Sequence, residues 1–314
     1  MRLNGGMTNS LGVPVGWSGG TGLNSIEAVR TEARYARELA VDTFWVSQIF
    51  GVDPIVALAA VADDLAGVRE VGTSVVPIYG RHPLALAAQA RTAQSAVPGT
   101  FTLGIGPSHA MVVEGFYGET YDRPYSHTAE YVEAITPLLA GQPTDMEGSE
   151  LTAKGWLTVE ADPVPLVLAA MGRRMLELAG RSTAGTMLGF PVGARTIADH
   201  IAPTINQAAA DAGAPPPRVI ASVAVAITDR RDEVVESSRA ANTMYSDLPA
   251  YRAMLEREGV ESPADLVVVG SEAEVHAGVM RFVEAGATEV RLGVAGPPAI
   301  QAATREALPS LLAP

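Results

Sequence analysis

Gly72-Thr73-Ser74-Val75-Val76-Pro77 is the stretch that decides the fold, together with a second strand-like run, Phe101-Thr102-Leu103-Gly104-Ile105-Gly106, that follows it after a helical pattern. Two strands joined by a helix lie parallel, because only a crossover connection returns the chain to the same sheet in the same direction. In parallel α/β proteins, ligands bind at the carboxyl ends of the strands. The second run opens into Pro107-Ser108-His109, so we expect part of a binding site there.

Short apolar runs alternate with helical patterns along the rest of the chain. Strands are expected at Met1–Gly6, Thr43–Ser47, Glu70–Val76, Phe101–Ile105, Pro165–Ala170, Gly185–Leu188, Arg218–Ile227 and Glu289–Leu292, with a further short one at Leu266–Val269. Eight principal strand–helix units predict an α/β fold, a (β/α)8 TIM barrel that forms a single domain over residues 1–314. Insertions are expected near residues 106–123, a long loop with several aromatic residues, and 142–160, a polar segment typical of a hairpin. An open doubly wound sheet is the alternative, disfavoured because no Gly-x-Gly-x-x-Gly motif follows the first expected strand.

The composition excludes several kinds of function. The net charge of −13 argues against nucleic acid or an anionic membrane as a partner, because both repel an acidic protein. No run reaches the roughly 18–20 apolar residues of a membrane span, and the N-terminus lacks the pattern of an export signal. The absence of cysteine excludes disulfides, thiolate nucleophiles and cysteine metal sites, and it is typical of a cytoplasmic protein.

Histidine is the residue type best suited to acid–base chemistry near neutral pH. His109 follows directly on a strand end and is the candidate catalytic residue, with a loop hydrogen bond as the alternative. His82 precedes a proline and is expected to cap a helix, His200 and His276 fall inside helices, and His127 lies in the helix after the aromatic loop. No histidine spacing typical of a metal site occurs, so no metal is predicted. The shortage of acid–base groups favours chemistry carried by an organic cofactor.

One strand end leads into a helix that is suited to bind an anion. The run Ala169-Ala170-Met171-Gly172-Arg173-Arg174 places small residues and two arginines at a helix N-terminus. Free backbone N–H groups and the helix dipole favour a phosphate at such a place. A tight turn with solvated arginines is the alternative.

An ordered set of motifs resembles the bacterial-luciferase-like flavin and deazaflavin oxidoreductases, most of all the branch that uses coenzyme F420. The motifs occur in that family's order and spacing, over nearly the whole chain. They are Phe44-Trp45-Val46-Ser47-Gln48, Gly72-Thr73-Ser74-Val75-Val76-Pro77, Phe101-Thr102-Leu103-Gly104-Ile105-Gly106, Leu168-Ala169-Ala170-Met171-Gly172, Gly270-Ser271 and Ala285-Gly286-Ala287.

The resemblance implies a (β/α)8 barrel with the cofactor across the carboxyl ends of its strands. It also implies a non-prolyl cis peptide bond at Ser74-Val75, which forms a bulge against the back of the cofactor ring. The implied contacts of the ring or ribityl chain are Ser47, Ser74, Val75, Val76, Pro77, Gly106 and Pro107. The implied phosphate contacts are Ala170, Met171, Gly172, Arg173 and Arg174.

The chain departs from the relatives that oxidise a sugar phosphate or an alcohol. Those relatives carry an acid and then a histidine where this chain has Ser47-Gln48, and a glutamate where it has His109. A histidine base is therefore missing at the catalytic position Gln48, and His109 is the candidate proton donor for a reduction. The expected pocket surroundings are apolar, which suits a neutral substrate: Trp17, Phe50, Phe116, Tyr117 and Phe190.

Three functions remain open at this point. The first is an F420-dependent oxidoreductase that transfers a hydride between reduced deazaflavin and a neutral organic substrate. The second is an FMN-dependent luciferase-like monooxygenase, and the third is a degenerate barrel that binds a ligand without turnover. The deazaflavin carries an acidic tail that would need a basic groove, for which Arg173, Arg174, Arg81 and Arg195 are candidates. The resemblance also implies a homodimer with a small-molecule substrate.

Overall fold

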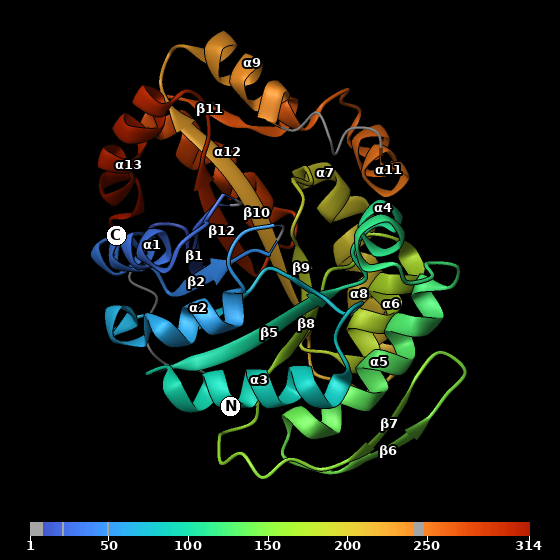
Figure 1. Cartoon of the computed structure of the whole chain (residues 1–314). Coiled ribbons are helices and arrows are strands. Elements are labelled where there is room, and N and C mark those ends of the chain that lie inside the picture. Colours follow the sequence, from blue (N-terminus) through green and yellow to red (C-terminus); the bar gives the residue numbers. More distant parts are fainter. Residues whose placement is uncertain (1–8, 21, 49, 242–247) are drawn as a thin grey trace. The chain divides into compact units, whose positions relative to one another are not determined.

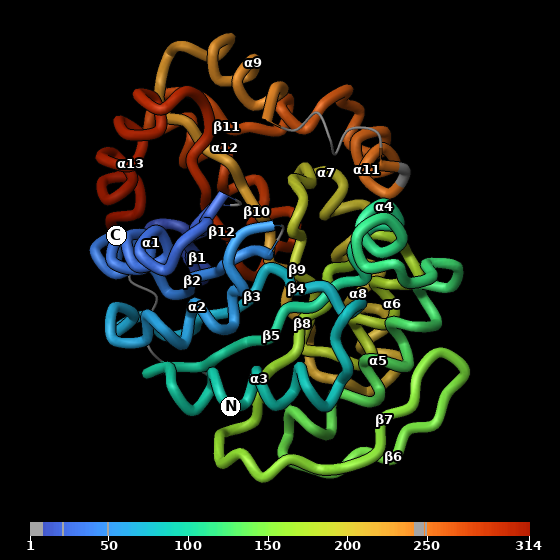
Figure 2. Tube along the Cα trace, viewed as in Figure 1, coloured from blue at the N-terminus to red at the C-terminus, as the bar shows by residue number. Residues whose placement is uncertain are grey.

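The computed structural model describes residues 9–20, 22–48, 50–241 and 248–314, and Figures 1 and 2 show the course of the chain. The fold class is α/β, a (β/α)8 barrel with insertion segments, in which eight principal strands are each followed by a helix within the described residues. The strand expected at Met1–Gly6 lies outside the described residues, and the first strand that the structure describes is β1, Val15–Ser18. The chain divides into two compact units, each described by itself below.

The first unit comprises residues Met1–Ser18, Leu188–Pro203 and Arg218–Pro314. Its strands lie parallel in the order β11-β10-β12-β1, with Val15 opposite Val290 and Trp17 opposite Leu292. Its elements are β1 (Val15–Ser18), α7 (Ala194–Thr196), the π-helical turn η3 (Ile197–Ile201), β10 (Arg218–Ile227), α9 (Arg231–Ala241), α11 (Pro249–Glu258), η4 (Pro263–Leu266), β11 (Val268–Gly270), α12 (Glu272–Glu284), β12 (Glu289–Val294) and α13 (Pro298–Leu312).

The second unit comprises residues Gly19–Met187 and Thr204–Pro217. Its parallel strands follow the order β2-β3-β5-β8-β9, and β4 lies beside β5 (Figure 2). Its elements are α1 (Ile26–Glu38), β2 (Thr43–Val46), α2 (Pro54–Ala60), η1 (Ala62–Leu65), β3 (Glu70–Thr73), β4 (Val76–Pro77), α3 (Pro83–Ala96), β5 (Thr100–Gly106), α4 (Ala110–Val112), the π-helical turn η2 (Val113–Tyr117), α5 (Pro124–Leu139), β6 (Thr144–Glu147), β7 (Thr152–Gly155), β8 (Leu166–Leu168), α6 (Arg173–Ser182), most of β9 (Gly185–Leu188) and most of α8 (Ala202–Asp211).

Side chains fix the starts of several helices. Ser25 accepts from Ala28 N at the start of α1, and Asp53 accepts from the first amides of α2. His82 accepts from Leu84 N and so caps α3, which confirms the cap expected of this histidine. Each cap satisfies an amide that the helix itself leaves without a partner and stabilises the helix by about 1 kcal/mol.

Gly72, the first residue of the stretch Gly72–Pro77, lies where neighbouring strands approach too closely for a larger side chain. A Cβ on Gly72 would stand 2.4 Å from Cζ3 of Trp45 and 2.6 Å from the carbonyl oxygen of Thr102. Gly72 therefore leaves room for the Trp45 ring, which is fully buried next to β3. The neighbouring strand residues on β2, Thr43–Val46, are all buried as well, so this part of the barrel is packed from both faces.

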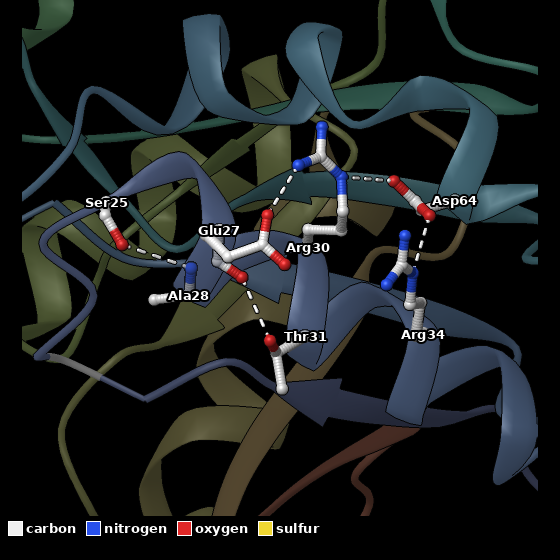
Figure 3. Close-up of polar contacts among 7 residues, drawn as sticks. All are labelled: Ser25, Glu27, Ala28, Arg30, Thr31, Arg34 and Asp64. Atoms are coloured by element: carbon white, nitrogen blue, oxygen red, sulfur yellow. Dashed lines mark hydrogen bonds and ion pairs between the residues drawn. The ribbon is translucent and has the colours of Figure 1, made fainter.

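A charged cluster ties α1 to η1 on the surface of the second unit (Figure 3). Arg30 Nε donates to Asp64 Oδ2 over 2.9 Å, and Arg34 Nε donates to Asp64 Oδ1 over 2.8 Å. Glu27 also accepts from Arg30, one turn along the same helix. The hydrogen bond from Arg34 holds the pKa of Asp64 below its usual range. Ion pairs near the surface, as here, orient the short helix η1 and add little stability.

The two expected insertion segments differ in structure. Residues 142–160 form the antiparallel hairpin β6–β7, and the Glu130 carboxylate on α5 accepts hydrogen bonds from the backbone of Ser149, Glu150 and Leu151 in its turn. Residues 106–123 are not a bare loop as expected: α4 and η2 fill the segment with helical turns. These short helical turns satisfy backbone groups that an extended loop would leave to water.

Arg91 on α3 anchors the chain that leads out of the hairpin. This buried guanidinium donates to the carbonyl oxygens of Leu139, Val159 and Ala161 over 2.8–3.0 Å. We expect Arg91→Met to lower the free energy of unfolding by about 2–4 kcal/mol, because three carbonyl acceptors lose a buried, charged donor. Urea denaturation measures the effect, and Arg37→Met on the exposed face of α1 serves as the matched control. Equal stability of the two variants would contradict the anchoring role.

Candidate active site

The site begins where β2 and β3 end, in the second unit. Ser47 follows β2 and Ser74 follows β3, and their hydroxyl oxygens lie 3.0 Å apart. Ser74 N also donates to the carbonyl oxygen of Val46, so the chain beyond β3 stays against β2. The Ser74-Val75 peptide bond is cis, at the position that the resemblance implies. After it, the two residues of β4 resume the pairing with Ile105 and Gly106 at the end of β5.

The bulge at Val75 faces two glycines of β5. A Cβ on Gly104 would stand 2.0 Å from the Thr73 carbonyl oxygen and 3.0 Å from Cγ1 of Val75. A Cβ on Gly106 would stand 3.1 Å from Cγ2 of Val75. Thr73 Oγ1 bonds both the amide and the carbonyl of Gly104, which locks the two strands together. The two glycines therefore make room for the half-buried Val75 side chain at these strand ends, and Ser47, Ser74 and Val75 form the strand-end surface.

Arg81 holds the side chain of Gln48, a role that the sequence pattern does not predict. Arg81 Nη2 donates to Gln48 Oε1 over 2.8 Å and to Asp53 Oδ2 over 3.0 Å, and Arg81 Nη1 donates to the Pro77 carbonyl over 3.2 Å. Its side chain is only 16% exposed, and Tyr131 Oη donates to its carbonyl oxygen. Arg81 is therefore engaged inside the second unit, which speaks against the basic groove expected of it.

A left-handed residue turns the chain from β5 toward His109. Ser108 has φ of +61°, an uncommon conformation for a residue with a Cβ, and Tyr121 Oη donates to its carbonyl oxygen over 2.9 Å. Burial raises the pKa of Tyr121 to about 12, so its hydroxyl stays protonated and can donate. His109 is half-buried at the start of α4, and burial lowers its pKa below the usual value. Its imidazole is therefore mainly neutral at pH 7.

A second aromatic group packs beside this turn. The His127 ring stacks on Tyr79 with ring centroids 4.4 Å apart, and Tyr121 lies 5.4 Å from Tyr79. Burial lowers the pKa of His127, against the opposing pull of Glu150, Glu119 and Glu130. The stacking makes His127 a packing residue of the long segment that carries His109.

The N-terminus of α6 carries the small residues and arginines of the expected anion site. Gly172 is the N-cap residue and supplies no side-chain cap, so the first amides of α6 remain available to a ligand. Ala170 N donates to Thr186 Oγ1, which fixes the approach to the helix. Arg173 pairs with Glu177 on its own helix, and the Arg174 guanidinium lies 3.8 Å from the ring centroid of Tyr125.

The aromatic residues expected around the pocket fall into both units. Phe50 and Phe116 form an exposed edge-to-face pair in the second unit, with centroids 5.5 Å apart and exposed fractions of 61% and 62%, and Tyr117 is also exposed. Trp17 and Phe190 belong to the first unit and are buried, where Phe190 stacks on Tyr251. These two are therefore core residues of the first unit.

Among the described residues, no group of three or more His, Cys, Asp or Glu side chains is placed to hold a metal ion. No helix in the described ranges is long and apolar enough to cross a membrane.

A comparison with known protein families matches residues 10–308 to the model of the luciferase-like monooxygenases. The chain belongs to this family. The match covers nearly the whole sequence and confirms the family named by the resemblance.

Individual relatives of this luciferase-like protein are distant. It is 24% identical to a 5,10-methylenetetrahydromethanopterin reductase of Methanolobus tindarius over 77% of this chain and 74% of that protein. It is 29% identical to a Mycobacterium tuberculosis protein named provisionally as a coenzyme F420-dependent oxidoreductase, over 46% of each chain, so that match spans under half of the relative. A solved F420-dependent secondary alcohol dehydrogenase has the same fold, with a TM-score of 0.80 at 18% identity over 95% of this chain and 98% of that one.

The structure brings together one group of the residues expected in the site of this luciferase-like protein. The strand ends of the second unit, and the segments that directly follow them up to the first turn of α6, carry the following residues: Ser47, Gln48, Ser74, Val75, Val76, Pro77, Gly106, Pro107, Ala170, Met171, Gly172, Arg173 and Arg174. Tyr121 and Thr186 support this group and were missed, and Arg81 supports it in another role than the basic groove expected of it. Each acts through a contact between residues that are not neighbours in sequence. Thr186 lies in the expected strand Gly185–Leu188 and Tyr121 in the expected insertion near residues 106–123, but no sequence pattern pointed to their contacts.

Proposed function

We propose that this protein is an F420-dependent oxidoreductase that reduces a neutral organic substrate. The observation that carries the proposal is the strand-end surface of Ser47, Ser74 and Val75 opposite Gly104 and Gly106. Gly104 and Gly106 leave room for Val75 beside β5, and a planar ring would lie against the Val75 side chain at these strand ends. The relative named as an F420-dependent oxidoreductase supports the choice of cofactor.

The residues present also fit the phosphate of such a cofactor. The first amides of α6 lack a side-chain cap, and Gly172 has no atom within 4 Å of the position that a Cβ would occupy, so an anion can approach closely. Arg173, Arg174 and Arg181 all lie on α6 and supply positive charge, with Arg174 and Arg181 both against Tyr125. This group of arginines would hold an acidic tail against the overall charge of −13.

The bound deazaflavin would supply a hydride donor or acceptor; the protein would supply orientation and a proton. Ser47 and Ser74 hydroxyls would orient the ring edge, and Val75 would press on one of its faces. His109 would give a proton to the substrate from the end of β5, as the residue of the site able to change its protonation state near neutral pH. The exposed Phe50–Phe116 pair would accept an apolar substrate surface.

The second candidate is an FMN-dependent monooxygenase of the same fold. The name of the matching family, luciferase-like monooxygenase, favours it. The strand-end surface and the α6 N-terminus suit an FMN ring and phosphate equally well, so the acidic tail is what separates the two cofactors. The proposal also includes a homodimer. It includes a cytoplasmic location as well, which the absence of cysteine supports.

A titration of the purified apo-protein with F420 and with FMN, followed by tryptophan fluorescence, tests the proposal. We expect F420 to bind at low micromolar concentration and FMN to bind at least about tenfold more weakly, because only F420 has a tail that can pair with the arginines of α6. The double variant Arg173→Ala/Arg174→Ala should weaken F420 binding by about tenfold or more, since two charged donors are lost.

The single variant Arg257→Ala, on the exposed last turn of α11, is the matched control and should bind F420 as the wild type does. Tight binding of FMN alone would establish the monooxygenase instead. Binding of neither cofactor would mean that the barrel has lost its cofactor and would overturn the proposal.

A further inference from the structure

Gln48 has a fixed amide orientation, because its partner can only donate. The guanidinium of Arg81 carries no acceptor, so the 2.8 Å contact from Nη2 must end on Gln48 Oε1. The Nε2 group therefore points away from Arg81. Among the described residues, the hydrogen bond of the Gln48 side chain is the one that Oε1 accepts from Arg81. Gln48 is half-buried at the end of β2, beside Ser47 of the strand-end surface.

Three contacts keep Arg81 in place while it holds Gln48. Asp53 Oδ2 accepts from the same nitrogen over 3.0 Å, the Pro77 carbonyl accepts from Nη1, and Tyr131 Oη fixes the Arg81 backbone. Asp53 is itself tied to the first amides of α2 through its other oxygen. The group is rigid, so the amide of Gln48 is oriented before a ligand arrives.

We propose that Arg81 positions Gln48 as a hydrogen-bond donor to a carbonyl oxygen of the substrate, and that the natural substrate is a ketone or an alkene conjugated to a carbonyl. This inference rests on the proposed function and names its substrate class. A hydroxyl substrate that must be deprotonated would need an acceptor at this place, and the orientation of Gln48 presents none.

The reduction of a conjugated carbonyl compound balances in electrons and protons with the groups of this site. Addition of a hydride to the β-carbon breaks the carbon–carbon π bond and moves an electron pair onto the carbonyl oxygen of the substrate. Gln48 Nε2–H would stabilise the charge that develops on that oxygen, as a preorganised donor does in other sites. The α-carbon then takes one proton from His109 or solvent, so the substrate gains two electrons and two hydrogens while reduced F420 is oxidised. For a ketone, the hydride adds to the carbonyl carbon and the proton goes to its oxygen.

Gln48→Glu is the sharpest variant, because it keeps the shape of the side chain and the contact to Arg81. One carboxylate oxygen still accepts from Arg81, while the other replaces the donor Nε2–H with an acceptor. We therefore expect the ligand preference to reverse. The wild type should bind cyclohex-2-en-1-one at least about tenfold more tightly than cyclohex-2-en-1-ol, and Gln48→Glu should bind the alcohol more tightly than the ketone.

The readout is ligand binding to the protein saturated with oxidised F420, which has no hydride to give to the ketone. Calorimetry gives the two dissociation constants, and infrared difference spectroscopy of [1-13C]cyclohex-2-en-1-one gives the carbonyl stretching frequency. A hydrogen bond from Gln48 shifts that frequency downward in the wild type, and the shift should disappear in Gln48→Glu and in Gln48→Met. An unchanged shift or an unchanged preference in both variants would overturn the proposal.

Arg81→Lys tests the positioning role. The lysine keeps the charge near Asp53 but lacks the planar fork, so Gln48 is freed to rotate and the ketone preference should fall toward unity. Arg69→Lys, the same change at an exposed arginine paired with Asp42 before β2, is the matched control and should leave the preference unchanged. If Arg81→Lys kept the full wild-type preference for the ketone, Arg81 would not be the residue that positions Gln48. Fluorescence titration of each variant with F420 separates these results from a failure of cofactor binding.

Discussion

Gly104→Ala is expected to lower the free energy of unfolding by more than about 3 kcal/mol and to abolish cofactor binding. The added methyl would stand 2.0 Å from the carbonyl oxygen of Thr73 and 3.0 Å from Cγ1 of Val75. The Thr73 backbone cannot yield easily, because Thr73 pairs with Val46 in the sheet and its hydroxyl bonds Gly104 at both backbone groups. Either β3 moves away from β5 or the bulge at Val75 is pushed out of place.

Urea denaturation and an F420 titration at low temperature measure the two effects. Gly115→Ala is the matched control, because no atom lies within 4 Å of its Cβ position and the residue is exposed on η2. That variant should stay within about 0.5 kcal/mol of the wild type. A Gly104→Ala protein of wild-type stability would mean that β3 and β5 are less tightly joined than the hydrogen bonds of Thr73 indicate.

His109→Gln is expected to lower the rate of substrate reduction by a factor of about 10²–10⁴, the usual contribution of a positioned proton donor. The wild-type rate should depend on pH in a defined direction. Burial lowers the pKa of His109, so the protonated form that donates becomes populated only below about pH 6.5. The rate of reduction should therefore rise as the pH falls from 8 to 5.5, and the variant should lose this rise.

Reoxidation of reduced F420 by cyclohex-2-en-1-one, followed at several pH values, gives both the rate and its pH profile. His276→Gln in α12 removes a histidine of the first unit and should leave both unchanged. A His109→Gln enzyme with the wild-type profile would assign the proton to solvent. Such a result would leave the cofactor and the role of Gln48 untouched, because neither depends on His109.

The same pKa shift has a consequence for stability. The folded protein binds protons at His109 and His127 less readily than the unfolded chain, since burial lowers both pKa values. Their contribution is fully present above about pH 6.5 and is lost as the pH falls through the folded pKa values. His109→Gln should therefore reduce the loss of stability on acidification, which urea denaturation at several pH values measures.

The periodic pattern of the chain was sufficient to predict most of the fold. Apolar runs such as Arg218–Ile227 and cap residues such as Asp53 act through their immediate neighbours, so their structure is readable locally. β1 at Val15–Ser18 was missed because Gly16 and Ser18 have little preference for strands. Buried neighbours stabilise it, with Val15 and Trp17 both inside the core.

In the candidate site, too, the local sequence pattern predicted some features and tertiary contacts decided the others. The sequence by itself determined the family, the order of the strand ends, and the residues that those ends present, because strand direction and the position of glycine follow from local pattern. Only the tertiary structure decided what those residues can do. The orientation of the Gln48 amide depends on Arg81, which is 33 residues away in the chain, and the turn at His109 depends on Tyr121. Hydrogen bonds between distant segments form only when the chain is folded, so no local pattern encodes them.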